Sequence, residues 1–384
     1  MNSKKLTALA IIAAASVVIA VAITIADNQK SATVTTAATP FVQGFDFSSV
    51  ATIDIAGQGS TFQLVKQGEG FIVPSKSNYP ADTPSINNLI NDITDINQDE
   101  TMTSNVELFE DLGVADGKGR TTIKFLDAAG KEIAHAGVII GSTQADAGGS
   151  YIRHPGQNDV YLSRNVPYLR TAALDYINKK VMDIKADQIA KVSSGSGASN
   201  FTIEKNAAGI ALLNVPAGLQ AKETEIQQTC DALADLSITD VHKTVEGATF
   251  DKTYVCELTD STVYTLKVAK VDTKYFFTCQ ATFKEKARVQ GGMVQGQKEV
   301  AKYGGQQAAK KFTDQHAGWI YEISSYIGDK MVKTFEDLSE DVPKPEAAEG
   351  ETPAVPTAPV VTPKASSIPP MLRAAPPTTT GPTK

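Results

Sequence analysis

Residues 50–73, VATIDIAGQGSTFQLVKQGEGFIV, carry apolar side chains at every second position in three short runs. The runs are Val50–Ile55, Thr61–Val65 and Phe71–Val73, and glycine-containing turns separate them. A period of two places the apolar side chains on one face of a strand, and glycine favours tight reversals between strands. The stretch therefore predicts an antiparallel β-meander with one buried face.

A helix is predicted directly after this meander. Asp82 or Thr83 can serve as the N-cap, and Pro84 suits the first helical turn. Apolar residues then recur three or four positions apart, which places on one helix face Ile86, Leu89, Ile90, Ile93 and Ile96. We expect this stripe to pack into the core; the alternative is a groove for a partner.

Further strands are predicted to complete a first domain. Thr121–Leu126 and Lys131–Ile140 form one hairpin, and Ser150–Arg153 and Val160–Leu162 form a second pair. Residues Pro167–Ile184 are interpreted as a helix, with the proline tolerated in its first turn. Its expected buried face includes Leu174, Ile177, Val181 and Ile184.

The second half of the chain repeats this order of elements. Matching apolar positions fall at one offset: Phe62 with Phe201, Leu64 with Ile203, and Phe71 with Ile210. The helix stripe recurs over residues 226–236, with Cys230 in the place of Ile90. A matched order of elements at a long period indicates duplication of one domain.

These patterns predict an α+β fold with two duplicated domains, each an antiparallel sheet with helices packed on one face. The domains span residues 46–184 and 185–340. Before them lie a cytoplasmic stub with a transmembrane helix (1–27) and a polar spacer (28–45). After them, residues 341–384 hold 11 of the 18 prolines and are expected to be a disordered tail. We expect this tail to be a spacer; the alternative is a contact for a proline-recognising partner or one that spans the cell wall.

The stretch Leu6–Ile25 has no charged residue and no proline. As a helix it would span ~30 Å, which matches the hydrocarbon core of a bilayer. Lys4 and Lys5 precede it, so the positive-inside rule leaves the N-terminus in the cytoplasm and the bulk of the chain outside. The prediction is a single-pass inner-membrane protein with a periplasmic body; a cleaved signal peptide is the alternative.

A locally basic segment, residues 284–318, interrupts the second domain where the first has only a short turn. Its cations form the candidate interaction loop: Lys284, Lys286, Arg288, Lys298, Lys302, Lys310 and Lys311. Long insertions are usually disordered or functional. We expect a flexible solvated loop, or a contact for anionic lipid headgroups or an acidic partner.

No residues are assigned to catalysis, a cofactor or a metal. The sequence lacks a complete phosphate-binding loop and a nucleophile elbow, and its four histidines are scattered. A net charge of −7 gives no support for nucleic-acid binding. The cysteines Cys230, Cys256 and Cys279 are odd in number, and the strands carrying the last two are expected to be separated by a third, so we expect free buried thiols.

Several short segments together resemble the bacterial domain-of-unknown-function 4340 family: Tyr79–Asp82, Leu108–Gly113, Ile140-Gly141, Tyr151–Arg153, Val160-Tyr161 and Gly318–Ile323. The resemblance covers roughly residues 45–340. It implies a duplicated, membrane-tethered, envelope-facing domain, often associated with ABC-type transport or gliding-type auxiliary components. It supplies no catalytic residues.

The sequence thus favours a non-enzymatic accessory or scaffold protein that contacts envelope proteins, including components of an ABC-type transport complex. Exposed strand edges or residues 284–318 are the candidate surfaces. The alternative is a periplasmic module that holds a glycan, lipid or peptide in a cleft between the two repeats. A hydrolase is disfavoured.

Overall fold

A computed structural model describes residues 39–57, 59–144, 146, 148–194, 200–206, 209–284 and 295–342 of the 384-residue chain, with only the backbone described for 295–302. The predicted membrane-spanning segment 6–25 lies outside these residues, as does the tail beyond Val342. Of the helices inside the described ranges, none has both the length and the apolar character needed to cross a membrane.

The first sheet has nine strands in the spatial order β5-β4-β3-β2-β8-β9-β10-β11-β7. All the pairings within it are antiparallel. In chain order the strands are β2 (Thr52–Gly57), β3 (Ser60–Gln67), β4 (Gly70–Val73), β5 (Tyr79–Pro80), β7 (Glu100–Thr103), β8 (Thr121–Leu126), β9 (Val138–Gln144), β10 (Gly149–Arg153) and β11 (Val160–Ser163).

The second sheet has eight strands in the order β15-β14-β13-β19-β20-β21-β22-β18. Its pairings are also antiparallel. In chain order the strands are β13 (Ile189–Ser194), β14 (Thr202–Asn206), β15 (Gly209–Leu212), β18 (Asp240–His242), β19 (Lys252–Leu258), β20 (Thr262–Val271), β21 (Lys274–Phe283) and β22 (Ile320–Ile323).

Three two-stranded antiparallel pairs supplement the large sheets. They are β1 (Thr39–Pro40) with β6 (Asn97–Gln98), β12 (Lys180–Met182) with β17 (Leu236–Ser237), and β16 (Leu219–Ala221) with β23 (Ser339–Asp341).

The two large sheets have the same strand order once β5 is set aside. Each strand from β4 to β7 across the first sheet corresponds in position to a strand from β15 to β18 across the second. In both, the edge strand β7 or β18 follows a helix in sequence and lies at the far side of the sheet from the opening meander.

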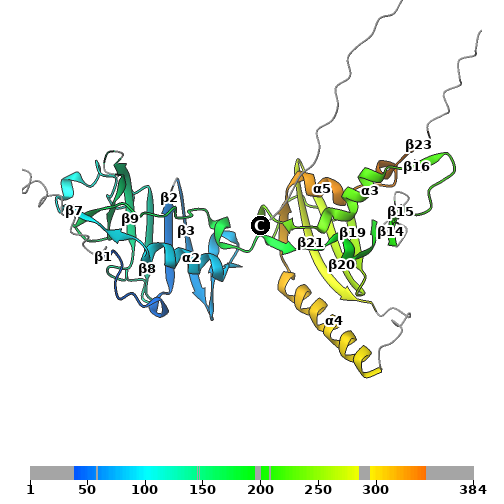
Figure 1. The fold of residues 1–384 in the computed structure, drawn as a ribbon, viewed down its shortest axis with the longest axis horizontal. Coiled ribbons are helices and arrows are strands. Elements are labelled where there is room, and N and C mark those ends of the chain that lie inside the picture. The colour runs from blue at the N-terminus through cyan, green and yellow to red at the C-terminus, as the bar shows by residue number, and fades with distance from the viewer. Residues whose placement is uncertain are drawn as a thin grey trace, which may run out of the picture. The chain divides into compact units, whose positions relative to one another are not determined.

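Four α-helices are described: α2 (Thr83–Thr94), α3 (Glu223–Cys230), α4 (Gln295–His316) and α5 (Ser325–Met331). Asp82 is the N-cap of α2, because its carboxylate accepts a hydrogen bond from the Ser85 amide at 3.0 Å. Figure 1 shows α2 lying across the strands of the first sheet. Its predicted stripe is buried at Ile86, Leu89 and Ile93, as expected.

The first sheet is covered on both faces at its β9–β11 end. One face joins the main core, whereas the other holds a second apolar cluster of Phe109, Val114, Ile139, Tyr151, Val160 and Leu162. The segment 105–116 between β7 and β8 contributes Phe109 and Val114 to this cluster. It includes the short 3₁₀-helix η3 (Val106–Leu108).

The prediction of a helix over 167–184 is wrong. This segment contains only the 3₁₀-helix η4 (Ala173–Tyr176) and strand β12. Its backbone is used by other elements: the Ile238 amide donates to the Lys179 carbonyl at 2.8 Å, and the Ile184 amide donates to Leu233 at 3.2 Å. The segment is therefore largely extended despite its helical apolar spacing, and it buries the side chains of Ile177 and Ile184.

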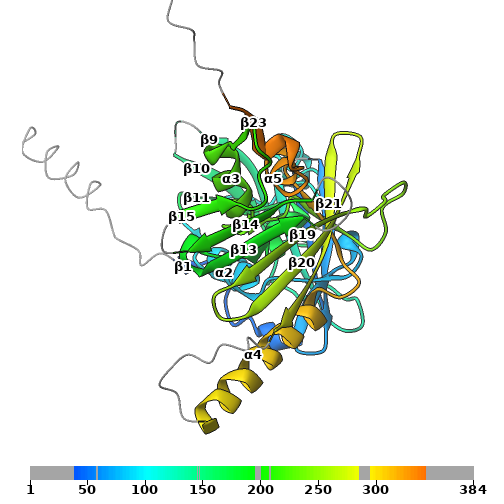
Figure 2. The ribbon, with the colours of Figure 1, turned by 90° about the vertical axis from the view of Figure 1, so that its right-hand side faces the viewer.

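The prediction of a flexible loop over 284–318 is also wrong for most of its length, because α4 occupies 295–316. The helix packs through Gly305, Ala309, Phe312, Thr313 and His316, at intervals of three and four residues. Gly305 is not a sign of flexibility here, since a Cβ at this position would lie 2.3 Å from the Phe283 ring. Figure 2 shows α4 extending past the end of the sheet.

Candidate functional site

The predicted interaction loop is divided by the structure. Lys284 is exposed at the end of β21, and its amide donates to the Ser261 carbonyl at 2.9 Å. Lys310 and Lys311 lie exposed on α4; Lys310 pairs with Asp314 one turn later, and Lys311 has no hydrogen bond or ion pair to the described part of the chain. Lys286 and Arg288 lie outside the described residues, and so do the side chains of Lys298 and Lys302.

One role of α4 is to cover an unpaired strand edge. On β21, the strand β22 covers only residues 275–277, so within the described residues the edge of β21 near Ala281 has no strand partner. The Thr313 hydroxyl accepts from the Ala281 amide and donates to the Ala281 carbonyl, both at 2.9 Å. The helix thus satisfies backbone groups that would otherwise be open to another chain.

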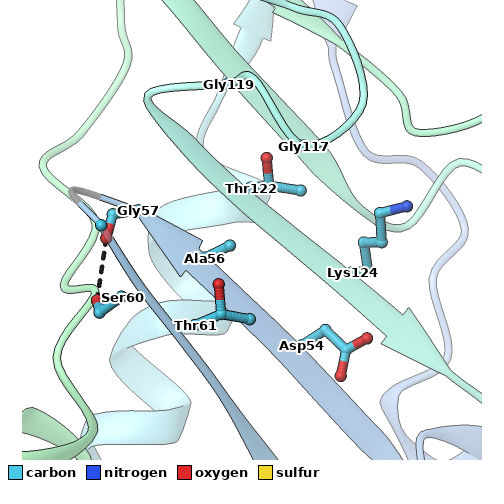
Figure 3. Close-up of a pocket in the computed structure, with 10 residues that line it drawn as sticks. Asp54, Ala56, Gly57, Ser60, Thr61, Gly117, Gly119, Thr122 and Lys124 are labelled. Carbon is cyan, nitrogen blue, oxygen red and sulfur yellow. Dashed lines mark hydrogen bonds between the residues drawn. The ribbon is translucent and has the colours of Figure 1, made fainter.

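A hollow of about 530 Å³ lies on the outer face of β2, β3 and β8 (Figure 3). Ala56, Thr61 and Thr122 are neighbours in the strand register and form a row of small side chains across it. Glycines at 57, 59, 117 and 119 border it, so no large side chain fills the space.

The charged groups beside this hollow already have partners. The Asp54 carboxylate accepts a hydrogen bond from the side-chain amide of Gln63 at 2.8 Å. Lys124 lies 3.3 Å from the Glu132 carboxylate and 3.7 Å from that of Asp116. The hollow therefore offers a ligand mainly threonine hydroxyls and backbone.

The clearest unpartnered surface is at the other end of the first sheet. Among the described strands, β7 is an edge strand that pairs only with β11, and its register shifts between Thr101 and Thr103. Three of the seven exposed large hydrophobic residues in the described ranges fall within seven positions here: Met102, Val106 and Leu108, exposed by 41%, 56% and 40%. We call these three residues together with β7 the β7 patch.

Acidic side chains surround the β7 patch. Residues 99–111 contain five acidic residues and no basic ones, and all five are exposed: Asp99, Glu100, Glu107, Glu110 and Asp111. The guanidinium of Arg164 lies 3.8 Å from the Glu100 carboxylate. An apolar strip on a free strand edge within an anionic surface suits an extended, cationic segment of another chain.

Sequence reasoning had named strand edges in general but not this one. The signal was present in the succession of apolar and acidic residues between two strands, over 102–111. This signal does not identify an exposed surface, because an exposed strand edge and a partly buried loop can have the same amino-acid composition. The structure separates them: Phe109 is buried, while Leu108 beside it is exposed.

Arg153 is buried on β10, with 1% of its surface exposed, and it holds the segment 105–116 in place. Its Nε donates to the Val114 carbonyl at 2.8 Å, and Nη1 donates to Gln157 at 2.6 Å. Nη2 pairs with Asp116 at 2.9 Å, and the guanidinium lies 4.5 Å from the Phe109 ring centroid. The charge is thus used to fix the backbone beside the β7 patch.

Two histidines are buried in polar contacts. His154 has its ring nitrogens 2.8 Å from the Gly137 carbonyl and 3.2 Å from that of Phe41, and its ring stacks on Phe41. The Nδ1 atom of His316 lies 2.6 Å from the Tyr321 hydroxyl. Burial lowers the pKa of both imidazoles, and for His154 it outweighs the two carbonyl contacts.

All three cysteines are free and buried, as predicted. β20 separates the strands of Cys256 and Cys279. In the strand register, Cys256 lies opposite Tyr264 of β20, and Cys279 lies opposite Leu266 of β20. Burial raises the pKa of each thiol to about 12, which makes them inert at neutral pH. Within the described ranges, no three His, Cys, Asp or Glu side chains gather in a metal-binding arrangement.

Comparison with known proteins identifies a family but no individual relative. Residues 73–255, from the end of β4 to β19, match the family model described as Domain of unknown function (DUF4340). No curated protein and no solved structure matches the chain. The region 73–255, which takes in strands of both sheets, therefore belongs to the DUF4340 family.

Proposed function

We propose that this protein is a membrane-anchored accessory protein that binds an envelope protein through the β7 patch. Residues 6–25 would supply the anchor and leave the duplicated domains outside the cytoplasm. The expected setting is an ABC-type transport complex, as the family resemblance implies. The observation that carries the proposal is the free edge of β7 beside three exposed apolar side chains.

The proposed occupant is an extended, cationic segment of the partner that pairs with β7 as an added strand. Its backbone would use the free amides and carbonyls of β7, and its apolar side chains would cover Met102, Val106 and Leu108. Basic side chains would meet the five carboxylates of residues 99–111. Strand addition supplies affinity from the backbone, while the side chains supply specificity.

The apolar part of this contact can be estimated. Full burial of a Val, Leu or Met side chain contributes ~1.5–3 kcal/mol, and these three are about half exposed. Covering them would contribute about 2–4 kcal/mol in total, so its loss weakens binding roughly 30-fold or more.

The test is photocrosslinking in intact cells, followed by purification from gently solubilised membranes. A crosslinker at Thr101 on β7 is expected to capture a component of a transport complex, whereas one at Asp272 in the β20–β21 turn is not. The triple variant M102S/V106S/L108S is expected to lose the crosslink, and Y326S, which removes an exposed apolar group on α5, is expected to keep it.

Equal capture by the triple variant and the wild type would contradict the role of the β7 patch. The anchor is tested separately by a reporter fused after Lys384, which is expected to be active only outside the cytoplasm. Activity only in the cytosol would overturn the proposed location. The variant Y303S on α4 tests the basic insertion as the rival surface, since loss of capture there would move the contact to α4.

Ligand binding is the second candidate function, with a cleft between the two repeats as the predicted place. Two hollows are lined entirely by residues of the first repeat, between positions 54 and 176. One is the hollow of Figure 3, and the other is considered next.

A further inference from the structure

A groove of about 490 Å³ lies between α2 and the segment 168–176 in the first domain. This volume is within the range of small-molecule sites, ~300–1,000 Å³. α2 contributes Asn88, Asn91 and Asp92, and the facing segment contributes Tyr168, Arg170 and Tyr176. The groove does not involve the β7 patch, so it is independent of the proposed docking function.

The two walls of the groove are joined by hydrogen bonds. The Asp82 amide at the start of α2 donates to the Tyr176 carbonyl at 2.7 Å. The Tyr176 hydroxyl donates to the Arg170 carbonyl at 2.9 Å, and its ring packs against Phe62 with centroids 5.7 Å apart. Burial raises the pKa of Tyr176, so this phenol stays protonated. The groove is therefore preformed.

Asn88, Asn91 and Arg170, which line the groove, are exposed to solvent. The side chains of Asn88, Asn91, Asp92 and Arg170 form no hydrogen bond or ion pair within the described part of the chain. Together they present amide donors and acceptors, carboxylate acceptors and a guanidinium fork. Tyr168, 78% exposed, adds an aromatic ring that no other side chain covers.

We infer that this groove binds an uncharged oligosaccharide. Each sugar hydroxyl can both donate and accept a hydrogen bond. The amides of Asn88 and Asn91 can do the same, while the Asp92 carboxylate accepts and the Arg170 guanidinium donates. The apolar face of a sugar ring can pack on the exposed Tyr168 ring. A phosphate ligand fits less well, because Arg170 is the single cation among the lining residues and Asp92 would repel the anion.

The inference is tested with the purified full-length protein on a panel of neutral oligosaccharides: cello-, malto-, manno-, galacto- and chito-oligosaccharides. At least one class is expected to bind with a Kd of ~1 mM or tighter by titration calorimetry. Asn88→Ala is expected to weaken that binding about 5–10-fold through lost hydrogen bonds. Tyr168→Ala is expected to weaken it about 10-fold through the lost ring contact.

Two control variants change residues that do not line the groove. Asn87→Ala removes an exposed amide of α2 that does not line the groove, and Tyr326→Ala removes an exposed ring on α5. Both are expected to bind the sugar as the wild type does. No binding to any panel member, equal binding by Asn88→Ala and wild type, or displacement of the sugar by inorganic phosphate would each overturn the inference. None of these outcomes bears on capture through the β7 patch.

Discussion

Replacing Arg153 by methionine is expected to destabilise the first domain by at least ~3 kcal/mol, because it leaves buried carbonyl groups without a donor. The side chain is buried beside the second apolar cluster and contacts four residues: Phe109, Val114, Asp116 and Gln157. Methionine would fill part of the space with apolar atoms, but it has no donor for the carbonyls that the guanidinium now satisfies.

The magnitude follows from those carbonyls. Val114 and Gln157 would each be left with an acceptor in a poorly solvated position, at ~1–3 kcal/mol apiece. The Asp116 ion pair adds little, because that carboxylate is 55% exposed and water can replace the lost partner. The loss of the guanidinium over Phe109 adds ~1 kcal/mol.

The assay is urea unfolding with midpoints compared at a common slope, together with hydrogen exchange of the amides in 105–116. Exchange should accelerate there first, because Arg153 is what fixes this segment. Arg164→Met is the control: its exposed pair with Glu100 should contribute no more than ~1 kcal/mol. A loss below ~1 kcal/mol for Arg153→Met, or unchanged exchange over 105–116, would refute the reasoning.

Three further predictions concern buried polar groups. Burial holds the pKa of His154 and His316 below the ordinary 6.5, so at mildly acidic pH the unfolded chain binds protons that the folded chain does not. The contribution of these two groups to the free energy of unfolding should therefore be complete above pH ~6.5 and should fall as the pH drops below it. Replacing either histidine by glutamine should flatten this decline in urea titrations. The three thiols should resist alkylation in the native state and react fully in urea, and fast labelling of native protein would contradict their burial. Thr313→Val should lower the free energy of unfolding by ~1–3 kcal/mol, since it leaves the amide and carbonyl of Ala281 unpaired, whereas the exposed Thr282→Val should have little effect.

The strands could be predicted from the sequence where one face of the sheet is buried and the other is exposed to solvent. β2 alternates strictly between partly exposed and buried residues, and the next two strands, β3 and β4, contain the predicted runs Thr61–Val65 and Phe71–Val73. The start of α2 was predictable as well, because Asp82 and Pro84 are local signals that need no distant contact.

The two misread segments show where local pattern fails. Residues 167–184 carry apolar side chains at helical intervals, yet their backbone pairs with residues far along the chain, and that competition decides the conformation. α4 lies in a long insertion, and that length suggested a loop. The helix also contains Gly304 and Gly305, and tertiary packing overrides the low helix propensity of glycine, since Phe283 needs the space that a side chain at 305 would take.

Alternation, capping residues and the matched order of two halves were sufficient to establish an antiparallel α+β protein before any coordinates were considered, because each is a local signal that the chain repeats. Which strand lies at an edge, whether an arginine is buried, and which polar side chains are left without partners depend on residues distant in sequence. The β7 patch, the burial of Arg153 and the groove beside α2 are all of this second kind, because long-range pairing and burial exist only once the chain has folded.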